Sequence, residues 1–312
     1  MLRKINIQKN NPREIFFYRN KSRNNYLFSI LIPTWNNLDY LKLCINSIKK
    51  NSKYKHQIIV HINQGDDGTL TWIKKQKIDY SYSEENIGIC YALNAASSLV
   101  RSSYIVYFND DMYACPDWDY FLHKEVKAQN TDYFFLSSTL IEPIFSKNIC
   151  TISPCNFGDT ISNFDEKKLI RSFKSFKKKD WNGATWPPSL VPKKLWDLVG
   201  GYSIEYSPGM YSDPDFSMKL WSYGVRNFKG VSDSRVYHFM SKSTRKMNHK
   251  IIDGKSLFLK KWGVSSNIFT NYYLRRGSLW NGQLGEPPKN IFILPRVFIS
   301  NLLNTFKGIW RH

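Results

Sequence analysis

The sequence lacks the cysteine pattern of a disulfide-stapled or zinc-binding protein. Its 5 cysteines are an odd number and none forms a CxxC pair, so neither a disulfide framework nor a thiolate zinc site is expected. No uninterrupted apolar run reaches the roughly 18 residues that cross a bilayer, and the first residues contain no signal-peptide core. We therefore expect a cytoplasmic protein without a membrane-spanning helix.

Acidic residues are also scarce. The chain has 25 Asp plus Glu against 45 Lys plus Arg, a formal net charge of +20. This excess predicts an anionic partner, which could be nucleic acid, the phosphates of a nucleotide or an acidic membrane face. The 42% hydrophobic and 16% aromatic content exclude a disordered chain. A length of 312 residues suits one large α/β domain or two small ones.

Apolar runs and helical periodicities alternate along the first half of the chain. Strands are predicted at 27–32, 57–62, 78–82 and 104–108, and helices at 38–50, 70–76 and 88–100. In the second half of the chain, 225–228 and 235–239 are predicted as edge strands. Strands that alternate with helices of this length indicate a parallel sheet with helices on both faces. In such a sheet ligands bind beyond the carboxyl ends of the strands.

The predicted strand ends carry polar and acidic residues. The most acidic is Asn109-Asp110-Asp111, directly after the apolar run 104–108. Carboxylates at that place could gather a hard divalent cation, which would neutralise a diphosphate; a solvated turn is the alternative interpretation. Later in the chain Asp213 and Asp215 begin a predicted helix, where they could supply a general base or simply cap the helix.

The motifs together resemble those of the inverting family 2 glycosyltransferases, which have the GT-A fold. The resemblance runs from Leu27 to about Gly263. It is carried, in the same order as in the family, by 30–36, 58–69, the Asn86-Ile87-Gly88 helix entry, Asn109-Asp110-Asp111 in place of the D-x-D motif, the glycine pair 200–201 and the acidic helix start 213–220. It implies a Rossmann-like, mostly parallel sheet that binds a nucleoside-diphosphate sugar.

The resemblance also implies a role for individual residues. The donor nucleotide is expected to contact Pro33, Thr34, Trp35, Asn36, Asn63, Asp67, Asn86, Gly88, Asn94, Asn109 and Asp110. Mn²⁺ or Mg²⁺ is expected on Asp111, with Asp110 beside it and His238 as a later ligand. Asp213 is favoured as the catalytic base and Asp215 is the second candidate, because Ser212 replaces the acidic residue that the family has before Asp213.

A third group of residues is predicted to bind the sugars. Trp181, Asn182, Gly183 and Trp186 lie where the family places its donor-sugar and acceptor wall, and indole rings suit the C–H faces of a pyranose. Two buried core tryptophans are the alternative. The irregular segment 142–180, which ends in the basic run 174–179, is predicted to form a loop over the site.

Three segments are predicted. Residues 1–26 form a basic polar extension, 27–265 a GT-A domain with a nucleotide-binding half (27–131) and an acceptor-binding half (132–265), and 266–312 a carboxyl-terminal extension. Residues 289–312 have basic and apolar residues on opposite faces of a helix. Such a helix could lie on an anionic membrane surface, or pack on the domain or on a partner subunit.

These features predict a metal-dependent glycosyltransferase, cytoplasmic or peripheral at the inner face of the cytoplasmic membrane. It would move a sugar, with a UDP-sugar as the favoured donor, to a glycan or glycolipid hydroxyl with inversion, in surface polysaccharide or lipopolysaccharide biosynthesis. A nucleotidyltransferase and a basic nucleic-acid-binding protein are the alternatives. Neither a phosphate-binding glycine loop nor an RNA-binding signature is found, so no nucleic acid is expected as partner.

Overall fold

The computed structural model describes residues 3–6, 14–21, 25–240 and 253–287. Its strands are β1 (Arg3–Asn6), β2 (Glu14–Tyr18), β3 (Ser29–Trp35), β4 (Gln57–Asn63), β5 (Asp79–Ser83), β6 (Tyr104–Tyr107), β7 (Met112–Ala114), β8 (Phe134–Ile141), β9 (Trp181–Asn182), β10 (Ser189–Pro192) and β11 (Asn227–His238). Its α-helices are α1 (Leu38–Asn51), α2 (Thr69–Lys75), α3 (Gly88–Ser97), α4 (Trp118–Ala128), α5 (Glu166–Ser172), α6 (Lys193–Val199), α7 (Ser212–Ser222), α8 (Gly254–Trp262) and α9 (Ser266–Ile268), with short helical turns at 161–163, 173–175, 204–206 and 269–273.

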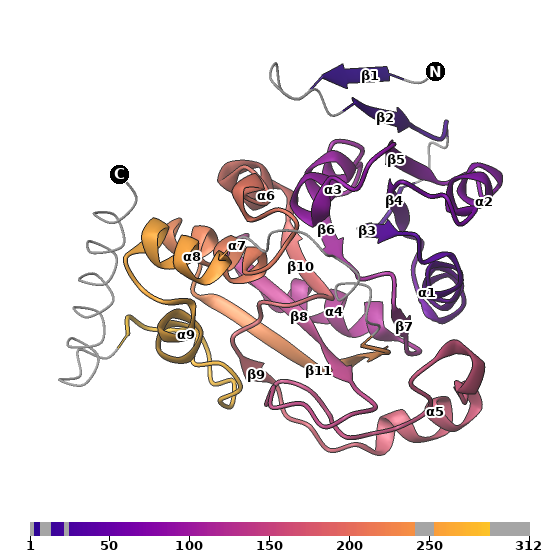
Figure 1. The fold of residues 1–312 in the computed structure, drawn as a ribbon. Coiled ribbons are helices and arrows are strands. Elements are labelled where there is room, and N and C mark those ends of the chain that lie inside the picture. The colour runs from indigo at the N-terminus through magenta and orange to yellow at the C-terminus, as the bar shows by residue number, and fades with distance from the viewer. Residues whose placement is uncertain (1–2, 7–13, 22–24, 241–252, 288–312) are drawn as a thin grey trace.

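The strands join in a single sheet. Its order in the described residues is β1-β2-β5-β4-β3-β6-β10-β8-β11-β7, with β9 paired to β11 (Figure 1). Strands β5, β4, β3 and β6 are parallel, as the alternation of strands and helices predicts, and β8 is parallel to β11. Antiparallel pairings join these two parallel groups through β10 and extend the sheet at both edges.

Helices cover both faces of the sheet because the strand residues alternate. Leu31 of β3 belongs to a core cluster with residues of α3, α6, α7 and α8 on one face, and its neighbours Ile30 and Ile32 belong to a second cluster with residues of α1, α2 and α4. In α1 the buried residues Leu41, Ile45 and Ile48 recur at helical spacing. The α/β layering expected from the sequence is thus confirmed.

The structure differs from the sequence prediction at two places in the sheet. Residues 14–18, predicted to precede the domain, form β2 and pair antiparallel with β5. Residues 225–228 and 235–239, predicted as two edge strands, belong largely to the single strand β11, which pairs with β8 along most of its length. A register shift between Val231 and Arg235 carries the strand across the polar residues 232–234.

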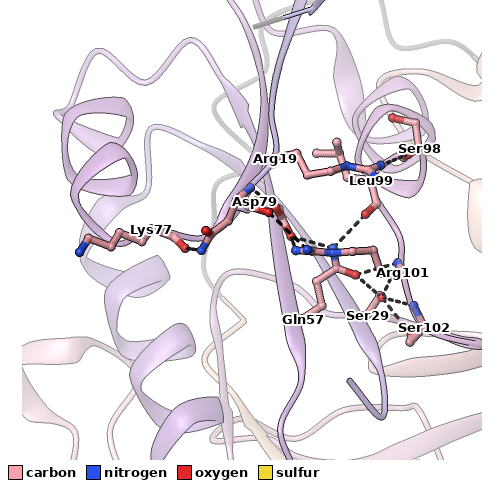
Figure 2. Close-up of polar contacts among 10 residues, drawn as sticks. Arg19, Ser29, Gln57, Lys77, Asp79, Ser98, Leu99, Arg101 and Ser102 are labelled. Atoms are coloured by element: carbon pink, nitrogen blue, oxygen red, sulfur yellow. Dashed lines mark hydrogen bonds and ion pairs between the residues drawn. The ribbon is translucent and has the colours of Figure 1, made fainter. Parts of the chain in front are cut away.

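A buried polar network ties the amino ends of the parallel strands together (Figure 2). The guanidinium of Arg101 forms an ion pair with Asp79, whose carboxylate also accepts a hydrogen bond from Gln57 Nε2 (2.7 Å). Ser29 donates to Gln57 Oε1 (2.6 Å). Because these groups lie at the ends of the strands opposite to the acidic residues, we assign this network to stability and not to catalysis.

Candidate active site

The acidic segment after β6 is buried against the end of β3. Asp110 is 9% exposed and Asp111 6%. Thr34, the sixth residue of β3, donates a hydrogen bond from Oγ1 to Asp110 Oδ2 (2.6 Å). Burial and the neighbouring charge of Asp111 raise the pKa of Asp110 to about 7. Two adjacent buried carboxylates are costly in free energy unless a proton or a cation neutralises them.

His238, the last residue of β11, lies between two carboxylates. Its Nε2 is 3.5 Å from Asp111 Oδ2 and its Nδ1 is 3.0 Å from Glu142 Oε1. Burial favours the neutral imidazole, but the two carboxylates outweigh burial and raise the pKa of His238 to about 10. The other oxygen of Glu142, Oε2, is buried without a hydrogen-bond partner. No sequence pattern points to Glu142, because a single glutamate before a proline belongs to no motif.

These donors suit a hard divalent cation. Carboxylate oxygen and the nitrogen of a neutral imidazole are both ligands of Mn²⁺, so Asp111 and His238, whose Oδ2 and Nε2 lie 3.5 Å apart, are the residues that would hold the ion. Within the described residues, however, no group of three or more His, Cys, Asp or Glu side chains is arranged to hold an ion. The remaining ligands would therefore come from the donor diphosphate or from water.

Asp213 lies in the first turn of α7 and is partly exposed. Its Oδ1 accepts a hydrogen bond from the hydroxyl of Tyr202 (3.0 Å). Burial raises the pKa of Asp213 to about 7, although the Tyr202 hydrogen bond acts in the opposite direction. A carboxylate with a pKa near neutrality can exchange a proton at physiological pH, as a general base must.

Asp215 differs from Asp213 in being enclosed. It is 0% exposed and accepts hydrogen bonds from Ser203 Oγ (2.6 Å) and Trp262 Nε1 (2.8 Å). The ammonium of Lys261 lies 3.0 Å from its Oδ1. These three partners occupy the carboxylate and connect α7 to α8, so Asp215 is placed to support the fold.

Tyr107, the last residue of β6, lies between the acidic segment and Tyr202, the hydrogen-bond partner of Asp213, along the chain of contacts. Burial raises its pKa well above the ordinary value, and the carboxylates of Asp213, Asp110 and Asp111 add to the increase. Its ring also meets that of Tyr202 edge to face, with centroids 6.0 Å apart. Tyr107 and Tyr202 thus connect the acidic segment that follows β6 with Asp213 at the start of α7.

Asn94 and Tyr202 fix the position of Asp213. The Asn94 side chain on α3 donates to the Tyr202 carbonyl (2.7 Å) and accepts from the Tyr202 amide (2.8 Å). At the start of α3, Gly88 has a φ of +76° and no space for a side chain, because a Cβ would lie 2.7 Å from Pro208 Cα. The amide of Ile89 donates to the Pro208 carbonyl (3.0 Å). Helix α3 thus holds the segment that leads to Asp213.

Most of the predicted nucleotide-binding residues lie in or after β3, β4 and β5, whereas Asn94 lies on α3 and Asn109 and Asp110 follow β6. Several of them hold the loops at the strand ends through hydrogen bonds. Asn36 accepts from the amides of residues 65 and 66, Asn63 from that of residue 87, and Asn86 from that of Gly88. Trp35 donates from Nε1 to Gln64 (2.6 Å). The Asp67 carboxylate accepts from the first amides of α1 and α2, at Leu38 and Thr69. Pro33 lies within β3 beside His61 of β4. The backbone oxygen of Asn109 accepts from Cys44 Sγ.

The predicted sugar wall is divided between buried and more open groups. Trp181 is 4% exposed, donates to Thr139 and covers Gly230 so closely that a Cβ there would be 1.9 Å from the indole. Asn182 donates to Ser278 and to the Leu279 carbonyl.

Trp186 is more open, with the guanidinium of Arg276 5.7 Å from a ring centroid. Both tryptophans line one small hollow together with Cys150 and Thr151. Gly183, with a φ of +92°, packs against Arg276.

An α/β layered sheet with an acidic segment at the carboxyl ends of its parallel strands is the arrangement expected of the GT-A fold. Residues 29–148 match the family model described as Glycosyl transferase family 2. This segment is therefore similar to the family that the sequence motifs predict, and residues 149–312 lie outside the match. The match includes Asp110 and Asp111 and ends before Asp213.

Solved structures with the same fold include three crystal structures of S. aureus TarS 1-349. The complex with UDP-GlcNAc has a TM-score of 0.54 at 13% identity, over 90% of this chain and 73% of that chain. A second TarS structure gives 0.52 at 14% identity, over 89% and 79%. The complex with UDP gives 0.50 at 14% identity, over 78% and 72%. At these identities the likeness shows the fold. None of the curated proteins matches the chain.

The structure bears on one of the two sequence predictions about membranes. Among the described residues no helix is long and apolar enough to span a bilayer. The amphipathic helix predicted at 289–312 lies outside the described residues.

Proposed function

We propose that this chain transfers a single sugar from a nucleoside-diphosphate donor to a hydroxyl of a glycan or glycolipid acceptor, with inversion. The observation that carries the proposal is the connection between two acidic groups: Asp213 accepts a hydrogen bond from Tyr202 (3.0 Å), whose ring meets that of Tyr107 at the end of β6, just before the acidic segment 109–111. The segment 109–111 would face the leaving diphosphate and Asp213 the incoming hydroxyl. The solved TarS complexes contain UDP-GlcNAc and UDP, which supports a UDP-sugar as the donor to test first.

Asp213 is the proposed general base. With a pKa of about 7 its carboxylate would accept the proton of the acceptor hydroxyl as the oxygen bonds to the anomeric carbon. The bond from that carbon to the diphosphate breaks on the opposite face, so the anomeric configuration inverts. Asp215 has its carboxylate engaged by Ser203, Trp262 and Lys261, which favours Asp213 of the two candidates.

Asp111 and His238 are the residues proposed to hold Mn²⁺ or Mg²⁺, with Asp110 beside them. When bound, the ion would supply positive charge that neutralises the leaving diphosphate. Thr34 would orient Asp110 through its hydrogen bond (2.6 Å). Glu142 would hold His238 at Nδ1 and leave Nε2 directed toward Asp111.

The remaining proposals concern the residues that contact the sugars, the division of the domain and the location of the protein. Trp186 and the hollow it shares with Trp181 are proposed to contact the transferred sugar or the acceptor. We also retain the division into a nucleotide-binding half (27–131) and an acceptor-binding half (132–265) as a proposal. Membrane contact through 289–312, a cytoplasmic location and a role in surface polysaccharide or lipopolysaccharide assembly are proposals of the same kind.

The test is to incubate the protein with Mn²⁺, a panel of sugar nucleotides and candidate acceptors, and to identify the nucleotide product. A glycosyltransferase releases the nucleoside diphosphate, whereas a nucleotidyltransferase acts on a nucleoside triphosphate and releases pyrophosphate. Asp111→Asn should abolish transfer, and Asp197→Asn on the surface of α6 is the matched control. Transfer at the wild-type rate by the Asp111 variant would refute the assigned role.

A further inference from the structure

The loop that follows β8 exposes large apolar side chains. Ile144 is 57% exposed, Phe145 67% and Ile149 58%. Leu279, 57% exposed, lies nearby, because Ile149 packs against Gly277 two residues before it. Soluble monomers rarely expose several large apolar side chains together unless the surface binds something.

Lysines surround these apolar residues. Lys147 is exposed within the loop itself. Lys178 donates from Nζ to the carbonyl of Ile149 (2.6 Å), which brings the basic run 174–179 against the loop. No aspartate or glutamate occurs in residues 143–158 or 167–179. We call Ile144, Phe145, Lys147, Ile149 and the lysines of 174–179 the loop surface; it combines exposed apolar side chains with positive charge.

The loop surface adjoins the candidate active site. Glu142, which contacts His238, is two residues before Ile144. Cys150, next to Ile149, lines the hollow between Trp181 and Trp186. A partner bound to this surface would therefore lie beside the side of the site proposed to receive the acceptor.

We propose that the loop surface docks on an anionic lipid bilayer. Ile144, Phe145 and Ile149 would enter the headgroup layer, and the exposed Lys147, Lys177 and Lys179 would face lipid phosphates. Apolar side chains flanked by lysine suit this partner, since burial of apolar area and attraction to anionic lipids add together. An acidic polysaccharide would use the lysines and leave the apolar residues in water. Binding to the bilayer does not depend on the proposed function. The suggestion that this binding brings the enzyme to a lipid-linked acceptor does rest on the proposed function.

Co-sedimentation of the full chain with vesicles tests the proposal. One set contains phosphatidylcholine and phosphatidylglycerol in equal parts, and the other phosphatidylcholine alone. The variant Ile144→Ser/Phe145→Ser/Ile149→Ser should lose at least about tenfold in partitioning onto the anionic vesicles. Leu198→Ser/Tyr223→Ser is the matched control, because Leu198 and Tyr223 are 49% and 50% exposed elsewhere, and it should partition like the wild type. Lys177→Gln/Lys179→Gln should weaken binding and reduce its salt dependence.

Three results would overturn the proposal: no vesicle binding by the wild type, equal binding to both vesicle sets, or wild-type binding by the triple variant. The last result includes the case in which residues 289–312 carry all of the binding. Turnover with a soluble acceptor separates this proposal from the proposed function. Loss of vesicle binding with normal turnover by the triple variant supports the loop surface, whereas absent turnover in a wild type that binds vesicles counts against the proposed function alone.

Discussion

Two aspartates separated by one residue on α7 have different surroundings, and their substitution should have different effects. Asp213→Asn should lower kcat by about 10²–10⁴-fold, the usual contribution of a general base, without lowering the midpoint of thermal unfolding. Asp215→Asn should instead lower that midpoint, because it leaves the Lys261 ammonium without its buried partner. Steady-state kinetics and thermal melts on both variants check this. A reversed pattern would transfer the base to Asp215.

The pKa of Asp213 predicts how activity and stability depend on pH. Only the carboxylate can accept a proton, so kcat/KM should rise as pH rises through about 7. Because the folded-state pKa lies above the unfolded one, the folded state holds this proton more tightly. Its contribution to stability is therefore lost as pH rises from about 4 to about 7.

Replacement of Asp213 by Asn removes that titration. Compared with the wild type, Asp213→Asn should gain free energy of unfolding as pH increases across the same window, measured by urea denaturation at several pH values. A constant difference between the two proteins at all pH values would show that Asp213 does not titrate as described.

Glu142 is a positioning residue in this proposal, and its effect should appear in metal affinity. Glu142→Gln keeps the shape of the side chain but removes the charge beside His238 Nδ1. Outer partners of ligating histidines typically contribute 10–100-fold to metal affinity. Titration followed by electron paramagnetic resonance should show Mn²⁺ affinity reduced by about that factor, with the thermal midpoint preserved. Unchanged Mn²⁺ affinity would remove Glu142 from the site.

At the residue scale, the sequence predicts site residues where adjacent residues form a motif. The proposed roles of Asp110, Asp111 and Asp213 come from such motifs. Those of Tyr107 and Glu142 do not, since these residues come together with the motif residues only after β6, β8 and β11 assemble in one sheet. Asn94 shows the opposite case: its motif position is visible in the sequence, but its hydrogen bonds to Tyr202 depend on a loop more than one hundred residues away.

At the scale of secondary structure, local periodicity sufficed where strand and helix alternate. The prediction of 38–50 against the observed α1 (Leu38–Asn51) is typical. Strand β2 was missed because its apolar residues stand in a basic, polar context and are stabilised by pairing with the distant β5. The sequence predicts two strands in place of β11 because the polar residues 232–234 break the apolar pattern. In the structure the strand continues across these residues with a register shift.

The network at the amino ends of the strands should contribute to stability alone. Arg101→Ala removes the partner of Asp79, which is 2% exposed. It should lower the free energy of unfolding by about 2–3 kcal/mol, a value below that of a fully buried pair because Arg101 is partly exposed. Urea denaturation measures this; Lys194→Ala, in an exposed pair with Asp132, is the control and should change little. Loss of turnover by a folded Arg101 variant would contradict the assignment.

At the scale of the whole molecule, the two proposed halves share one sheet. Strand β10, from the second half, lies between β6 and β8, and each main core contains residues of both halves. We therefore expect a single cooperative unfolding transition that a bound donor shifts as a unit, by about 2.7 kcal/mol at one hundred times its Kd. Calorimetry with and without UDP-sugar and Mn²⁺ checks this. Two separate transitions, of which the donor moves one, would show that the halves fold independently.

The contact between α3 and the chain ahead of α7 also constrains how new specificities can be made. At Gly88 the backbone of Pro208 leaves no room for a methyl group. Further along the same helix, the Asn94 side chain forms two hydrogen bonds with the backbone of Tyr202. A recombinant hybrid whose junction falls between α3 and residue 201 would take the two sides of each contact from different parents and disturb both contacts. Crossover points should therefore be chosen so that α3 and residues 201–213 come from the same parent.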